Sequence, residues 1–178
     1  MTTRREFLRM SVASGAMLAV RGAGATEPPT LLPAQPRKPV IFEVPYGACD
    51  THVHIVGDRG LYPLVSGRAY TPPEASVDQL RVLHRNLNLD RVVVVQPSFY
   101  GTDNRCTVDA VRALSYRARG VAVIDQSNSD AELDEMNRAG IRGVRLNLAT
   151  AGIADPAASG RLLRATVARV QDRKSTRL

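Results

Sequence analysis

Two hydrophobic patterns alternate along the chain. Short apolar runs rich in β-branched residues, typical of strands buried in a parallel sheet, are followed by stretches with apolar residues at helical spacing. The pattern predicts strands over 48–55, 91–95, 120–124 and 143–148, and helices over 77–87, 107–119, 130–140 and 159–170. Strand and helix therefore alternate four times, which favours a parallel α/β fold.

This alternation occurs both in open doubly wound sheets and in (β/α)8 barrels. The turn after the first predicted strand lacks the glycine-rich phosphate loop of dinucleotide-binding open sheets, which argues against that class. A complete barrel needs about 250 residues. The 178 residues of this chain would therefore hold about the first four β/α units of a barrel.

The ends of the chain differ from its centre. Residues 3–9, with the pair Arg4 and Arg5, resemble the twin-arginine export consensus, and 10–20 form an apolar run too short to span a bilayer. A small-x-small site ends at Ala25. We expect a signal peptide over 1–25, the twin-arginine export machinery as partner, a periplasmic mature protein and no stable membrane anchor. An amphipathic surface helix is the alternative.

The remaining boundaries follow from composition. Residues 26–45 are proline-rich and predict a linker, and 46–171 hold the predicted α/β domain. The polar, basic stretch 172–178 is unlike a domain terminus. It indicates the end of a truncated or read-through gene fragment, with a genuine short protein as the alternative.

The formal charge of +7 comes from the two ends. Residues 27–160 carry 14 basic and 15 acidic side chains, which argues against a nucleic-acid-binding surface on the body. The two cysteines, Cys49 and Cys106, follow no disulfide or metal spacing, and we expect free thiols although a bridge stays possible.

The candidate chemistry begins on the first predicted strand. His52 and His54 are two residues apart, so their side chains point to the same side of a strand and can share one metal ion or one substrate oxygen. Asp50, two residues before His52, is expected on the same face, where it can orient an imidazole N–H. The alternative is that both histidines are polar positions on a half-exposed face. His84 is expected on a helix surface.

Other polar residues follow the later strands. Arg145 is flanked by Val144 and Leu146, so it should point into a barrel, where its planar fork suits a carboxylate; a salt bridge to an interior carboxylate is the alternative. Ser98 and Thr102 are hydroxyl donors for an anionic substrate, although loop hydroxyls are common. Further strand-end candidates are Asp125, Gln126 and Asn147.

Three ordered motifs carry a family resemblance. Residues 49–54, 96–104 and 140–147 resemble the amidohydrolase superfamily, in its amidohydrolase-related branch (family 2) and the dicarboxylate-lactonase-like group. The resemblance covers about 40–170. It implies a TIM-type (β/α)8 barrel, here the N-terminal half, and decides against the open sheet.

The resemblance also implies an activity. Members hydrolyse lactones or related bonds of carboxylated small molecules, or decarboxylate them. It gives His52 and His54 the role of polarising the scissile carbonyl for water, and Ser98 and Arg145 that of binding the substrate carboxylate. Zinc-using relatives bind the ion through the same pair, so the expected cofactor is none or one divalent metal, zinc by preference.

The chain departs from the family pattern in two respects. The later histidine and the last-strand aspartate, which acts as general base, have no counterpart, and 148–160 lack the expected carboxylate-binding arginine. A hydrolase, a zinc-dependent hydrolase or decarboxylase, and a catalytically inactive fragment therefore stay open as hypotheses.

Overall fold

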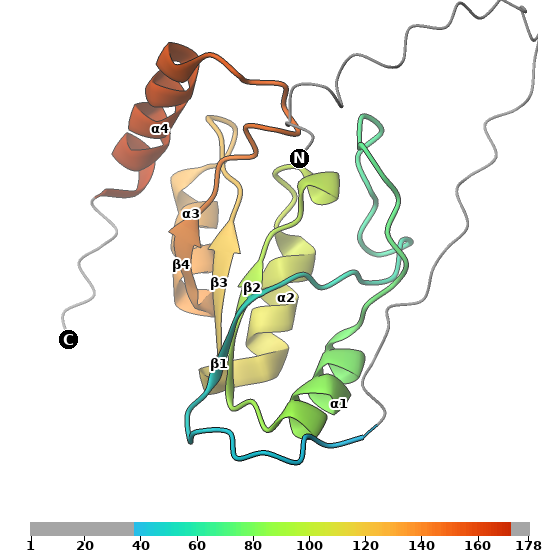
Figure 1. Ribbon diagram of the computed structural model, residues 1–178. Helices are drawn as coiled ribbons and strands as arrows, with labels where there is room; N and C mark the ends of the chain where they lie inside the picture. The colour runs from blue at the N-terminus through green and yellow to red at the C-terminus, as the bar shows by residue number, and fades with distance from the viewer. Residues whose placement is uncertain (1–37, 172–178) are drawn as a thin grey trace, which may run out of the picture.

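One parallel sheet organises the structure. A computed structural model of the protein describes residues 38–171. Neighbouring strands pair in parallel in the order β1-β2-β3-β4 (Figure 1). The strands are β1 (Cys49–Val53), β2 (Arg91–Val95), β3 (Ala118–Ala122) and β4 (Ile141–Val144); the helices are α1 (Val77–Leu87), α2 (Arg105–Leu114), α3 (Asp130–Ala139) and α4 (Pro156–Val170), with 3-10 turns η1 (Ser98–Tyr100) and η2 (Ser115–Arg117).

The hydrophobic core lies between the sheet and α1, α2 and α3. In Figure 1, α2 and α3 lie behind the sheet and α1 lies beside β1 and β2, and none of the described helices covers the front face. Alternate strand residues such as Val92 and Val94 are buried against Leu80, Val111 and Leu133 of the three helices. The front face is therefore left open for polar side chains.

Capping residues set the helix boundaries. Ser76 and Ser129 each form a capping box with the residue three positions later, which satisfies backbone N–H groups at the start of α1 and α3. Asp155 caps α4 through the N–H groups of Ala157 and Ala158. At the other end of α3, Gly140 adopts a left-handed conformation (φ +107°) and stops the helix.

The structure confirms four β/α units and corrects their limits. The third and fourth strands begin and end earlier than predicted, at 118–122 and 141–144. The second helix runs over 105–114, because Ser115 adopts φ +58° and diverts the chain into η2. The last helix begins at Pro156, whose fixed φ suits a first helical position, and not near residue 159.

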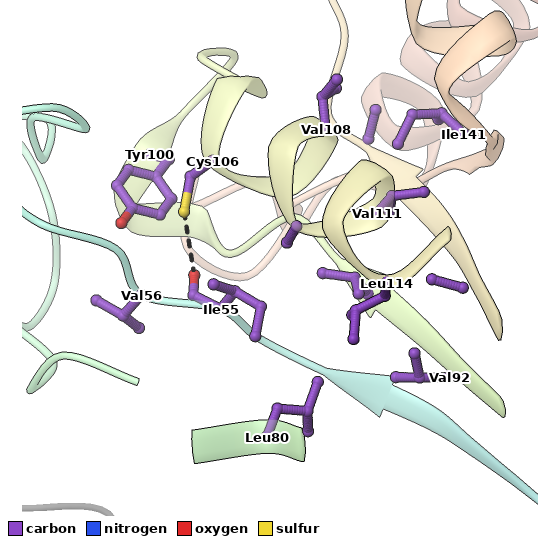
Figure 2. Packing of buried hydrophobic residues seen from close by; sticks show 14 of the residues in the cluster. Ile55, Val56, Leu80, Val92, Tyr100, Cys106, Val108, Val111, Leu114 and Ile141 are labelled. Atoms are coloured by element: carbon purple, nitrogen blue, oxygen red, sulfur yellow. Dashed lines mark hydrogen bonds between the residues drawn. The ribbon is translucent and has the colours of Figure 1, made fainter. Parts of the chain in front are cut away.

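The predicted chain ends fall mostly beyond the described residues. The signal peptide over 1–25, the linker up to residue 37 and the tail over 172–178 lie outside them. Within 38–171, no helix has the length and apolar character needed to cross a membrane. In the same range Cys49 and Cys106 are unpaired, and the Cys106 thiol faces the Ile55 carbonyl at 3.8 Å inside the core (Figure 2).

Candidate functional site

A register shift in β1 turns the two histidines to the open face of the sheet. Asp50 aligns with Val92 and Val53 with Val94, both on the helix-covered side of β2, so one extra residue is accommodated between the two pairs. His52 and His54 consequently point away from the helices. Their ring centroids lie 5.1 Å apart with an interplanar angle of 80°. The two rings therefore lie side by side, and their role as a catalytic pair stays a prediction.

Asp50 does not lie beside the imidazole pair, contrary to expectation. Its Oδ2 faces Nε2 of His84 on α1 at 3.4 Å, and its Oδ1 accepts the backbone N–H of His52 at 3.4 Å. The expected alternation assumed a regular strand, and the register shift reverses the face of Asp50. His84 is correspondingly part-buried against β1 and is not a free surface side chain.

A backbone carbonyl fixes the tautomer of His54. Its Nδ1 lies 2.8 Å from the Val95 carbonyl oxygen. Because a carbonyl oxygen only accepts, Nδ1 carries the hydrogen and Nε2 keeps its lone pair. Burial lowers the pKa of His54 below its ordinary 6.5, and the nearby His52 and Arg145 lower it further, against the opposing effect of the Val95 bond. The ring is therefore neutral at pH 7.

Arg145 brings a positive charge to the same place. It lies directly after β4, where its backbone N–H donates to the Ala122 carbonyl and its Nη1 donates to the Gln96 carbonyl at 3.1 Å. Among residues 38–171 no carboxylate forms an ion pair with Arg145. Within this part of the chain, Arg145 therefore does not form the interior salt bridge that was the alternative prediction. Its positive charge is available to an anionic ligand.

Gln96 anchors the segment that follows β2. Its side chain is fully buried, donates to the Asp103 carbonyl at 2.8 Å and accepts the hydroxyl of Thr107. The side-chain amide of Asn104 bonds both backbone groups of Val123, which directly follows β3. The segment between Gln96 and Asn104 is therefore held rigidly at the carboxyl edge of the sheet.

Within residues 38–171, the other predicted site residues form no hydrogen bond with His52 or His54. Ser98 begins η1, and no hydrogen bond of its hydroxyl is seen within the described range. Thr102 lines a polar hollow of about 660 Å³ between α2 and α3, lined also by Arg105 and Glu135, which does not include the histidine pair. Asp125 accepts from Ser127 in its own turn, and that bond lowers its pKa.

The described residues do not complete a metal site. His52 and His54 offer two imidazole ligands, whereas catalytic zinc takes three protein ligands. No group of three possible ligands among His, Cys, Asp and Glu gathers anywhere in the part of the chain that the structure describes. Residues 38–171 therefore supply two of the ligands that a catalytic zinc ion would need.

The comparisons with known proteins decide the family. The amidohydrolase family model matches residues 49–174, which is most of the chain and contains all the strands. The chain belongs to the amidohydrolase family. The (β/α)8-type fold expected from its motifs is thereby confirmed for the units present, as the solved relatives are barrels of this family matched over part of their length.

Three relatives define this amidohydrolase more closely. It is 46% identical over 114 residues to the 2-pyrone-4,6-dicarboxylate hydrolase of Comamonas testosteroni, covering 64% of this chain and 37% of that one. It is 35% identical to the 4-sulfomuconolactone hydrolase of Rhizobium radiobacter (66% and 40% covered). A crystal structure of a probable 2-pyrone-4,6-dicarboxylic acid hydrolase from Acinetobacter baumannii with citric acid bound matches with TM-score 0.57 at 30% identity (69% and 46%). The chain spans less than half the length of these relatives.

Sequence reasoning missed several contacts that build the candidate site. The Val95 and Gln96 carbonyls that orient His54 and Arg145 are backbone groups, and nothing in a sequence marks them. Asn147, considered only as a strand-end residue, has a buried Oδ1 without a hydrogen-bond partner in the described structure. Such a group is costly unless something donates to it.

Proposed function

We propose that this protein is a hydrolase that opens a lactone, or a related bond, in a carboxylated small molecule. The observation that carries the proposal is the convergence of His52, His54 and an Arg145 without a carboxylate partner on the open face of the sheet. The names of the two relatives, a 2-pyrone-4,6-dicarboxylate hydrolase and a 4-sulfomuconolactone hydrolase, support it.

Arg145 is the proposed carboxylate-binding residue. One edge of its guanidinium is fixed by the Gln96 carbonyl, which leaves further N–H groups for an anion. A charge-assisted bond of this kind typically contributes about 1.5–3 kcal/mol. Ser98 is retained as a second donor because it follows β2 at the same carboxyl edge of the sheet at which Arg145 follows β4. Thr102 needs a different orientation to contribute, since it lines the hollow between α2 and α3.

The two imidazoles take different roles in the proposed reaction. The N–H of His54 is committed to Val95, so His54 offers a proton-accepting Nε2. The His52 ring also carries an N–H, which suits donation to the carbonyl oxygen of the lactone. Water adds to the carbonyl carbon, the ring C–O bond breaks, and the leaving oxygen takes a proton. The residue that activates the water is not assigned within 38–171.

A zinc-dependent hydrolase or decarboxylase is the second candidate. Its supporting observation is the tautomer of His54, because an imidazole with Nδ1–H bonded to a carbonyl presents Nε2 in the form that ligates metals. Metal analysis of the purified chain separates the candidates. If the chain contained about one zinc ion and chelation abolished hydrolysis, the zinc-dependent mechanism would replace the proposed mechanism without metal.

The decisive experiment compares Arg145→Met with Arg138→Met in turnover and binding. Arg138 is an exposed arginine on α3 that pairs with Glu135, so it controls for the loss of one positive charge. We expect Arg145→Met to weaken binding of 2-pyrone-4,6-dicarboxylate about 10- to 100-fold and the control to leave it unchanged. Equal binding in both variants would refute the assignment. Binding without turnover in the wild type would favour the inactive-fragment hypothesis.

Export by the twin-arginine route and a periplasmic location form a separate proposal. It rests on the pair Arg4 and Arg5, the apolar run and the small residues before Ala25. Replacing both arginines by lysine should retain the protein in the cytoplasmic fraction. Recovery of the variant in the periplasm would contradict the proposal.

A further inference from the structure

The contact between α1 and β1 involves a polar pair in a part-buried position. The side chains of His84 and Asp50 are 11% and 25% exposed, and Nε2 of His84 lies 3.4 Å from Oδ2 of Asp50. An ionised carboxylate only accepts hydrogen bonds, so Nε2 of His84 carries the hydrogen. Neighbouring α1 residues Leu80 and Leu83 pack into the core, which places His84 beside apolar contacts where an unpaired polar group is costly.

The second oxygen of Asp50 connects this pair to the candidate site. Oδ1 accepts the backbone N–H of His52, the residue located within the register shift of β1. A strand ladder is locally disrupted at such a shift, and backbone groups there need other partners. One carboxylate thus bridges the outer helix and the irregular part of the strand.

We propose that His84 and Asp50 are positioning residues that set the orientation of His52. His84 fixes Asp50, Asp50 fixes the backbone of His52, and the shifted strand then directs the His52 ring toward His54. His54 has its own anchor in the Val95 carbonyl, so its ring depends less on α1. The inference deepens the proposed function, because it names what holds the carbonyl-polarising ring in place.

The test measures the geometry of the two rings directly. The chain has three histidines, so replacing His84 leaves only the pair in the imidazole region of a proton NMR spectrum of the untagged full chain. With centroids 5.1 Å apart, the wild-type rings should give a nuclear Overhauser cross-peak. We expect His84→Leu to lose most of that intensity. His84→Gln, whose amide nitrogen can donate in place of Nε2, should restore it.

Asp78→Asn is the matched control, because Asp78 lies on the exposed side of α1 and pairs with Arg81. It should keep the wild-type cross-peak. The inference would be overturned if His84→Leu kept the full cross-peak intensity. It would also be overturned if His84→Gln lost as much intensity as His84→Leu. If His84→Leu fails to fold by circular dichroism, Asp50→Ala answers the same question, and a retained cross-peak there overturns it equally. Because the readout needs no turnover, an inactive chain would refute the proposed function and leave this inference standing.

Discussion

The buried bond between Thr107 and Gln96 gives the sharpest stability prediction. The Thr107 hydroxyl on α2 donates to Oε1 of Gln96, and the two residues are 1% and 0% exposed. Thr107→Val keeps the shape of the side chain and removes the donor. Oε1 of Gln96 is then left without that partner in a site that water does not reach.

The expected cost follows from this desolvation. A buried acceptor left unsatisfied costs about 1–3 kcal/mol, whereas the helix propensities of threonine and valine are nearly equal. A loss of about 2 kcal/mol lowers Tm by roughly 4–8 °C in a domain of this size. The Gln96 carbonyl also accepts from Arg145, so anion binding should weaken together with stability.

Thermal and urea unfolding followed by circular dichroism would measure this effect. Thr150→Val is the control, because the Thr150 hydroxyl bonds the Asn147 carbonyl on an exposed loop. Such a surface change stays within about 0.5 kcal/mol. If Thr107→Val cost no more than Thr150→Val, the buried bond would not stabilise the fold and the account of the segment after β2 would be wrong.

Two further predictions concern the pH dependence and the packing of the sheet. Because burial holds the folded-state pKa of His54 below 6.5, the unfolded chain binds the proton more readily, so the free energy of unfolding falls as pH drops through 6.5 and levels off below the folded pKa. An NMR titration midpoint at or above 6.5 would contradict this. Gly120→Ala should cost about 1–3 kcal/mol, since a Cβ there would lie 2.2 Å from Cδ1 of Ile141, and Gly67→Ala, with open space around it, should cost little. Ile141→Val removes that atom and should recover part of the loss; no recovery would point to a different cause.

The sequence by itself determined the elements of this protein, because their causes are local. The valine run of β2 and the helical spacing of apolar residues over 77–87 and 130–140 act over a few residues, and they placed the second strand and the starts of two helices correctly. The predicted end of α2 was wrong because the hydrophobic pattern carries no signal for it. That helix ends where Ser115 adopts a positive φ of 58°, a backbone conformation that the hydrophobic pattern does not mark.

The tertiary structure decided how the site is oriented. The contacts that do so join residues far apart along the chain: Asp50 with His84 across 34 positions, His54 with Val95 across 41, and Arg145 with Gln96 across 49. The sequence pattern identified the histidine pair and the arginine. It placed Asp50 on the wrong face, because a register shift depends on how β1 packs against β2 and leaves no periodic signal. Which nitrogen of His54 carries the hydrogen is likewise set by a carbonyl of the neighbouring strand, and only the assembled sheet brings that oxygen within reach.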